Sequence, residues 1–208
     1  MATNSPWPTI HTERAALADD LATLTEAHWA TTSLCPGWSV HDVRGHLTAT
    51  AKMTPPRFLA RLAGSGFRFN TMAHKNIAAE TGAGPAATLA EFRRVQNATS
   101  APPGPVDSWL GETIVHAEDI RRPLGILHTY PPEALIRVAE FYKGSNLLIG
   151  AKSRIAGLTL HASDTDWTTG TGPEVTGPML SLLLAMTGRT TATADLSGDG
   201  ATMLRSRA

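Results

Sequence analysis

The sequence predicts an α+β protein in two parts: an all-helical part over residues 1–150, then a small α+β part over residues 151–208. Three observations lead to this prediction. Apolar residues recur every three or four positions through most of the first part, which is the spacing of one helix face. After about Arg154 the pattern changes to short alternating runs rich in threonine and glycine, typical of strands and turns. The 208 residues also suffice for a sizeable core with a small appended domain.

We expect the first helix to begin with Thr12 as its N-cap and to present one apolar face made by Leu17, Leu21 and Leu24. The segment TTSLCPG, residues 31–37, ends it.

The second helix is expected to begin at Ser39, because a serine followed three residues later by Asp42 is a capping signal. Its apolar face is made by Val43, Leu47 and Ala51.

Prolines and glycines divide the rest of the helical part. Pro55-Pro56 interrupts the second helix, and the stretch from Arg57 to Glu80 is interpreted as short helical pieces joined at Gly64 and Gly66. Three further helices are expected: one after Gly84-Pro85, one over Val106 to about Ile120 that Pro123 and Gly125 stop, and one opened by Pro131-Pro132 that carries Leu135, Val138, Phe141 and Leu147-Leu148.

The second part begins with a predicted strand in GLTLHASD. The run DWTTGTGPEVTGP has hairpin texture around Gly170 and Gly172-Pro173, and its Trp167 is expected in the core of the small domain. A buried helix over 178–187, a short strand over 190–196, a GDG turn and a last helical turn complete the prediction.

Composition favours a globular protein of the cytoplasm. The formal net charge is zero, which gives no electrostatic case for a nucleic-acid or acidic-membrane partner. The single cysteine, Cys35, excludes an intrachain disulfide and fits a reducing compartment. The N-terminus has no signal-peptide pattern, and the most apolar run, Met179 to Met186, is far shorter than the roughly 20 residues of a membrane span.

One pair of residues suggests metal chemistry. Glu112 and His116 lie four residues apart, which places both on one helix face, and no other glutamate has a histidine at that spacing. His46, near the start of another helix, is the natural third ligand, and two imidazoles with one carboxylate suit Zn²⁺ or a similar divalent ion. The spacing alone equally allows a surface Glu–His pair and an unrelated core histidine.

Other polar residues have two interpretations each. Asp42 precedes His46 by four and could orient its imidazole or simply cap the helix. Asp119 could hold His116 or pair with Arg121 or Arg122. Cys35 could be a reactive thiol or a fourth ligand, although a buried structural cysteine is the simpler interpretation. His41 is expected to be solvated and Trp38 to form a hydrophobic staple, while His28, His74, His128 and His161 have no partner at a useful spacing.

Three motifs resemble one family. LCPGWSVHDVRGHL, GETIVHAEDIRRPLG and GLTLHASDTDWTTGTGPEVTGPMLSLLLAMTGR occur in order and are similar to segments of the DinB-like mycothiol-dependent maleylpyruvate isomerase family. The resemblance implies an up-down four-helix bundle followed by a small sterol-carrier-like α/β domain. It also implies that His46, Glu112 and His116 hold a divalent metal, usually zinc, and that Arg189 helps hold a thiol cofactor or substrate.

The chemistry that the resemblance implies is use of mycothiol as a metal-activated nucleophile. A coordinated thiol loses its proton at neutral pH, so it could add to a small electrophilic acid and either leave after cis–trans isomerisation or stay in an S-transfer. Arg189 would pair with a carboxylate of the substrate or cofactor. We expect a small thiol and a small electrophile as partners, no nucleic acid or membrane, and a monomer or homodimer.

The chain departs from the family in residues 53–85, which are individual and are expected to line the substrate side of the site. Two other functions therefore remain open: a non-catalytic module with a structural metal closed by a fourth ligand such as Cys35 or Asp42, and a metal-dependent hydrolase that needs Asp119 or Asp42 as general base.

Overall fold

A computed structural model describes residues 5–147 and 149–208. The chain divides into two compact units, 1–128 and 129–208. The sequence placed the boundary at residue 150. The boundary lies nearer the N-terminus than predicted because the helix over Pro132–Lys143 packs against the helix over Met179–Met186. Within the described residues no helix has the length and apolarity needed to cross a membrane.

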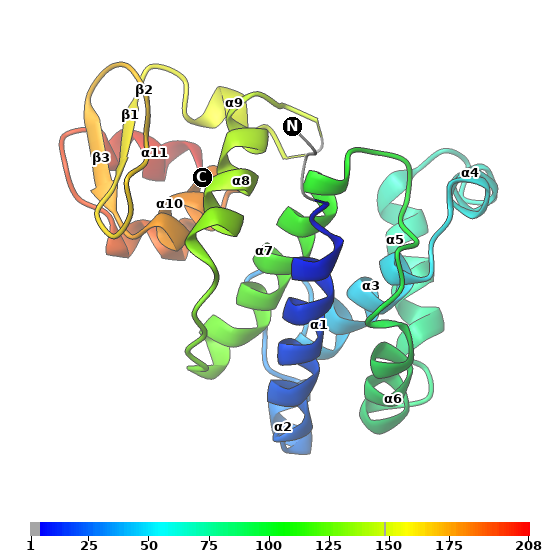
Figure 1. Cartoon of the computed structure of the whole chain (residues 1–208). Helices are drawn as coiled ribbons and strands as arrows, with labels where there is room; N and C mark the ends of the chain where they lie inside the picture. The colour runs from blue at the N-terminus through cyan, green and yellow to red at the C-terminus, as the bar shows by residue number, and fades with distance from the viewer. Residues whose placement is uncertain (1–4, 148) are drawn as a thin grey trace. The chain divides into compact units, whose positions relative to one another are not determined.

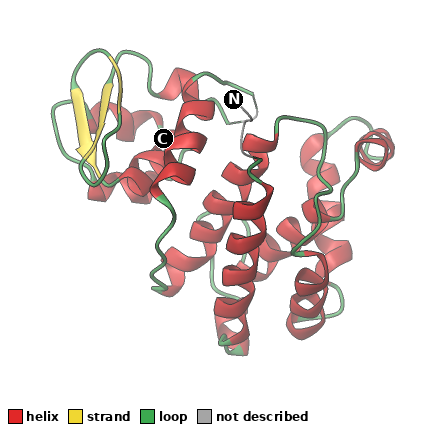
Figure 2. Cartoon of the chain, viewed as in Figure 1, coloured by secondary structure: helices red, strands yellow, loops and turns green. Residues whose placement is uncertain are grey.

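The first unit is built from helices only, within the described residues (Figures 1 and 2). They are α1 (Trp7–Ala22), α2 (Glu26–Trp29), α3 (Val40–Ala51), α4 (Pro55–Ala63), α5 (Phe69–Thr81), α6 (Pro85–Val95) and α7 (Val106–Leu124). Helices α1, α7, α3 and α6 contact one another in a closed ring, and α5 packs against α3. The ring is a four-helix bundle, which confirms the predicted α+β class together with the small sheet of the second unit.

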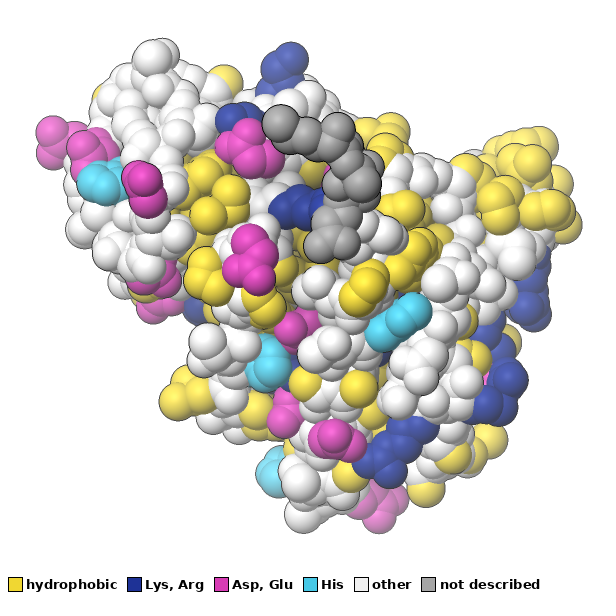
Figure 3. All heavy atoms as spheres, viewed as in Figure 1, with side chains coloured by type: hydrophobic (Ala, Val, Ile, Leu, Met, Phe, Trp, Pro, Cys, Tyr) yellow, Lys and Arg dark blue, Asp and Glu magenta, His cyan; other side chains and the backbone are white. Residues whose placement is uncertain are grey.

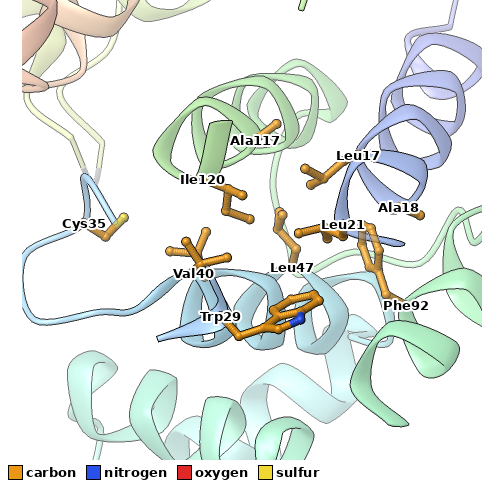
Figure 4. Close-up of a cluster of buried hydrophobic side chains, with 11 residues drawn as sticks. Leu17, Ala18, Leu21, Trp29, Cys35, Val40, Leu47, Phe92, Ala117 and Ile120 are labelled. Carbon is orange, nitrogen blue, oxygen red and sulfur yellow. The ribbon is translucent and has the colours of Figure 1, made fainter. Parts of the chain in front are cut away.

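The core of the bundle lies where α1, α3 and α7 meet (Figure 4). Leu17 and Leu21 of α1, Leu47 of α3 and Ile120 of α7 are almost completely buried there. Each comes from the helical spacing that the sequence displays, and burial of each leucine or isoleucine side chain contributes about 1.5–3 kcal/mol. This core fixes α3 and α7, the two helices that carry the candidate ligands.

Helix α3 begins as predicted. The Ser39 hydroxyl accepts from the backbone N–H of Asp42 at 3.2 Å, and the Asp42 carboxylate accepts from the backbone N–H of Ser39 at 2.9 Å, which completes a capping box. In the middle of α3, a Cβ on Gly45 would stand 2.6 Å from Cγ2 of Thr81. The glycine therefore allows α5 to approach α3 closely.

The first helix begins earlier than predicted, at Trp7 rather than at Thr12. Pro6 and Pro8 flank its first residue, where a proline costs nothing because the N–H groups of a first turn lack helical acceptors. The hydroxyl of Thr12 instead donates to the carbonyl of Pro8 at 3.1 Å, inside the helix.

The other predicted breaks are confirmed. Helices α4 and α6 begin at Pro55 and Pro85, and the joint between α4 and α5 contains Gly64 and Gly66. Helix α7 is capped by Gly125, whose φ of 67° is the left-handed conformation that glycine adopts without strain. It runs through Pro123 to Leu124, beyond the expected end near Ile120, because a proline there removes only one hydrogen bond of the last turn.

The second unit contains α8 (Pro132–Lys143), α9 (Ala151–Arg154), β1 (Thr159–Ala162), β2 (Thr168–Gly170), β3 (Glu174–Gly177), α10 (Met179–Met186), the 3-10 helix η1 (Thr190–Asp195) and α11 (Ala201–Arg207). The predicted strand near Leu160, the buried helix and the last helical turn are confirmed, and Trp167 is buried with its indole N–H donating to Glu140 at 2.9 Å. Helix α8 ends before Leu147, which is exposed, and the predicted continuation at Leu148 lies outside the described residues.

Two predictions for this unit are wrong. The run around Gly170 and Gly172 is not a hairpin, because the sheet order is β2-β1-β3: β1 lies between the two strands, antiparallel to β2 and parallel to β3. Glycine is needed there because a Cβ at either position would stand 2.1 Å from a backbone oxygen near β1. Residues 190–195 form η1 rather than a strand, since the Thr193 hydroxyl bonds locally to the carbonyl of Thr190 at 2.7 Å.

Candidate metal centre

His46, Glu112 and His116 come together in the first unit, although His46 is far from the other two in sequence. Each offers one ligand atom, and these three atoms lie within 4.8 Å of one another. Nε2 of His46 is 3.1 Å from Oε1 of Glu112, and the two imidazole rings meet edge to face with centroids 4.9 Å apart. The packing of α3 against α7 thus produces the convergence that the sequence predicted.

The Glu112 carboxylate has an unfilled acceptor. Its Oε1 is buried and, among the described residues, has no aligned hydrogen-bond donor, although Nε2 of His46 lies nearby. Burial would raise the pKa of the Glu112 carboxyl, but the contact with His46, the charge of His116 and the Thr50 hydroxyl together hold it below its usual value. A buried carboxylate oxygen without a donor, between two imidazoles, is an arrangement that a cation would satisfy.

The imidazole of His116 is oriented by Asp119. Its Nδ1 lies 2.8 Å from Oδ2 of Asp119, three residues later on α7, and this fully buried carboxylate also accepts from the Cys35 thiol at 3.0 Å. With Nδ1 engaged, Nε2 is the nitrogen left to bind an ion. Of the two interpretations of Asp119, orientation of His116 is the one that the geometry supports.

Cys35 contacts His116 but is not one of the three candidate ligands. Its sulfur is 3.5 Å from Nδ1 of His116, and it groups with His116 and Asp119 rather than with His46 and Glu112. Asp42 is occupied as the cap of α3, accepting from the Ser39 hydroxyl at 2.7 Å. Neither residue therefore belongs to the set of three that would hold a metal.

The sequence missed the role of Trp38. Besides preceding the cap of α3, its ring lies over the candidate ligands, with centroids 5.2 Å from His46 and 6.3 Å from His116. The exposed His74 of α5 contacts the same indole edge-on at 6.4 Å. This contact supports the expectation that residues 53–85 reach the site. Only the proximity of Trp38 to His46 along the chain could have suggested it.

Four other histidines have partners that the sequence analysis did not identify. His128 contacts the buried Glu13 at 2.8 Å, and His161 lies 3.4 Å from Glu174. His41 is not simply solvated, because its ring lies 3.3 Å from the Thr88 hydroxyl. His28 completes the capping box of α2. None of these four belongs to the set around Glu112.

Arg189 lies in the second unit, directly before η1, where its guanidinium donates to the carbonyl of Thr187 at 3.0 Å. Burial lowers the pKa of the neighbouring Arg154, and the positive charge of Arg189 lowers it further. Arg154 is held by the carbonyls of Ile149 and Met186. The unit therefore holds two cations close together.

His46 and Glu112 lie within a known domain, whereas His116 follows its matched region. The family model described as the mycothiol maleylpyruvate isomerase N-terminal domain matches residues 10–113, which is half of the chain. The chain belongs to this family. The family resemblance of the sequence is thereby confirmed, and this is a family of enzymes.

Solved structures agree on the fold. A crystal structure of the mycothiol-dependent maleylpyruvate isomerase has a TM-score of 0.66 to this chain, and that of a histidine-to-alanine mutant has 0.65. Each is 13% identical, covering 97% of this chain and 94% of the other. No curated protein matches the chain by sequence. At this identity the structures establish the common fold, with both a helical bundle and a small second unit.

Proposed function

We propose that the protein is a divalent-metal enzyme, with zinc the favoured ion, that uses a low-molecular-weight thiol of the mycothiol type for isomerisation of, or S-transfer to, a small electrophilic acid. The observation that carries the proposal is the set of His46, Glu112 and His116, whose ligand atoms lie within 4.8 Å of one another around a buried carboxylate oxygen that lacks a donor. Membership of the isomerase family supports the use of a thiol.

The three side chains would hold the ion through two imidazole nitrogens and one carboxylate, which is a typical catalytic zinc set. A bound divalent ion supplies a Lewis acid that favours the thiolate form of a thiol at neutral pH. Asp119 keeps the proton of His116 on Nδ1, so that Nε2 stays available. Cys35 and Asp42 are engaged elsewhere, so no fourth protein ligand closes the set among the described residues.

Other residues would shape the surroundings of the reacting thiol. Trp38 covers the imidazoles with a half-buried aromatic face, which excludes water and offers a flat surface to an unsaturated acid. Arg189 is proposed to bind a carboxylate of substrate or cofactor, and the neighbouring charge of Arg154 supports an anion preference in that unit.

The hydrolase alternative is less well supported because it needs a general base near the metal. Asp119 is fully buried and already accepts from Cys35 and His116, while Asp42 is bound to Ser39. Neither carboxylate is placed to take a proton from water. We also propose that the enzyme works in the cytoplasm, where reduced Cys35 and a reduced thiol cosubstrate are both maintained.

Metal analysis tests the first half of the proposal. After removal of any affinity tag, the purified protein is expected to hold one divalent ion per chain, and His116→Ala to hold none. His41→Ala is the matched control, because this histidine lies on α3 but bonds to Thr88. A wild-type protein without stoichiometric metal after incubation with zinc contradicts the proposal.

Thiol dependence tests the second half. Turnover of a panel of small unsaturated acids and other electrophiles is expected only with both mycothiol and metal, and Arg189→Ala is expected to raise KM more than it lowers kcat. Turnover with metal but without thiol would establish the hydrolase instead. Metal binding with no thiol-dependent turnover of any electrophile would favour a non-catalytic module.

A further inference from the structure

The segment from α4 into α5 exposes large apolar side chains. We call residues 55–75 the α4–α5 elbow. Helix α4 has no buried residue and packs against α5. Leu59 is 61% exposed, Phe67 77% and Phe69 44%. Figure 3 shows hydrophobic side chains gathered over the projecting α4. Among the other described residues of the first unit, Leu127 is the one large hydrophobic residue that is exposed.

The backbone at Phe67 adopts a strained conformation. Phe67 has a φ of 59°, in the left-handed region that non-glycine residues rarely adopt, and it is the only such residue described. Its backbone N–H donates to the carbonyl of Leu62 at 2.9 Å, which closes the turn after α4. A strained residue with an exposed phenyl ring suggests a function at the surface, since folding alone gains nothing from it.

The elbow is also strongly basic. No acidic residue occurs between Asp42 and Glu80, whereas the elbow contains Arg57, Arg61, Arg68 and Lys75. The zero net charge of the whole chain conceals this local excess. Arg61 donates to Asn76 of α5, and Lys75 donates to the carbonyl of Gly64 at 3.2 Å, so two of the cations also fix the shape of the elbow.

The positive charge of the α4–α5 elbow decides which kind of partner could bind to it. A second copy of the chain packed symmetrically on the same face would bring two sets of four cations together, which is unfavourable. An anionic lipid surface satisfies both features, because phenylalanine and leucine enter the headgroup boundary while arginine and lysine pair with the phosphates. We propose that the α4–α5 elbow is a peripheral contact surface for anionic membranes. The proposal goes beyond the proposed function and does not depend on it.

Vesicle cosedimentation of the full chain tests this directly. The protein is expected to sediment with vesicles of equal parts phosphatidylglycerol and phosphatidylcholine, and to stay in solution with phosphatidylcholine alone. Binding should weaken between 0.1 M and 1 M salt, where the screening length falls from about 10 Å to about 3 Å. Equal binding to both vesicle types, or none to the anionic ones, overturns the proposal.

Variants assign the effect to the elbow. Arg57→Gln with Arg68→Gln should lower the partition coefficient by about thirtyfold, since each basic residue near an anionic surface contributes about a factor of five. Leu59→Ser with Phe67→Ser should lower it at least about tenfold. Leu127→Ser is the matched control, because this leucine is 97% exposed but outside the elbow, and it should change nothing. Each variant is checked by its thermal melt.

Two results would contradict the assignment. Binding that survives all four elbow substitutions would place the membrane contact elsewhere. Sedimentation velocity without vesicles that shows a dimer in the wild type and a monomer in the Leu59→Ser/Phe67→Ser variant would identify a second copy as the occupant. An acidic protein captured by the elbow in place of lipid would leave the vesicle assay negative and overturn the proposal equally.

Discussion

Helix α3 carries two polar side chains with very different surroundings on opposite faces, the half-buried His46 and the fully buried Arg44. His46 faces α7, where Glu112 lies 3.1 Å away and the ring of His116 packs against it. Arg44, two residues earlier and therefore on the other side of the helix, is fully buried. Among the described residues none of its guanidinium nitrogens has a hydrogen-bond partner, and its charge lies over the ring of Trp29 at 5.3 Å.

The two faces of α3 show how a functional site differs from a charge that is buried at an energetic cost. Burial lowers the pKa of Arg44 to about 9, with only partial compensation from the charge of Glu80, so the folded protein holds this cation at a penalty. On the His46 face, by contrast, polar groups from α3, α7 and the Cys35 loop converge, and the buried acceptor that lacks an aligned donor, Oε1 of Glu112, lies 3.1 Å from Nε2 of His46. Several buried polar groups that converge indicate a function, whereas one that stands alone indicates a cost.

The largest effect is expected from removing the carboxylate that orients His116. In Asp119→Ala, Nδ1 of His116 and the Cys35 thiol both lose their contact with this carboxylate, so metal affinity should fall about 10–100-fold. Asp42→Ala removes a carboxylate from the cap of α3 and should cost about 1 kcal/mol of stability with no loss of metal affinity. Zinc titration and chemical denaturation of both variants distinguish the two roles. Equal loss of metal in both would contradict them.

The other face of α3 should respond in the opposite direction. Arg44→Met removes an unpartnered buried charge and keeps much of its volume, so the free energy of unfolding should rise by about 1–3 kcal/mol even after loss of the contact with Trp29. Urea denaturation measures this change. A destabilised variant would mean that Arg44 has a partner in solution, and the contrast between the two faces would fail.

Substitution of Cys35 distinguishes whether this residue positions Asp119 or binds the ion. In Cys35→Ala the Asp119 carboxylate loses one hydrogen bond, so stability should fall by about 1 kcal/mol while metal affinity changes less than about threefold. If the variant lost its metal altogether, Cys35 would be a ligand and the set of three would be wrong. Denaturation and zinc titration on the same sample give both readings.

The smallest effect is expected at the exposed end of α3. Lys52 pairs with Glu80 at 2.9 Å and Glu91 at 2.6 Å, and Arg94 and Lys52 together lower the pKa of the Glu91 carboxyl to about 2. Lys52→Met should cost about 0.5–1 kcal/mol at neutral pH. Because the pKa of Glu91 is depressed in the folded state, this contribution is present above pH 4.5 and is lost as the pH falls toward 2. Denaturation across that range should show the two proteins converging, and a constant difference would exclude the ion pairs as its cause.

How far the sequence predicted the fold depended on whether the signal was local. The Ser39–Asp42 cap, the prolines that open α4, α6 and α8, and the spacing of Leu17 and Leu21 are all local, and they specified most helices. The sheet order could not be read in the same way. The glycines near Gly172 indicate a tight turn, but only tertiary packing places β1 between the two strands.

The same distinction holds for the site. Glu112 and His116 are visible as a pair because four residues make one turn of α7, and Asp119 follows one turn later. His46 could be proposed as the third ligand, but its distance along the chain carries no geometric information, and the family motif was the stronger reason to choose it. The placement of Trp38 over both imidazoles and the thiol contact of Cys35 depend on how loops pack, which no spacing rule describes.

Two histidines and one glutamate are proposed to hold the ion and to leave a position for a thiol. X-ray absorption at the zinc edge of the loaded protein tests it most directly. We expect two imidazole nitrogens and carboxylate oxygen without sulfur, and then one sulfur at about 2.3 Å after addition of mycothiol. Sulfur in the coordination sphere before the thiol is added would show that Cys35 closes the site, and would contradict the account.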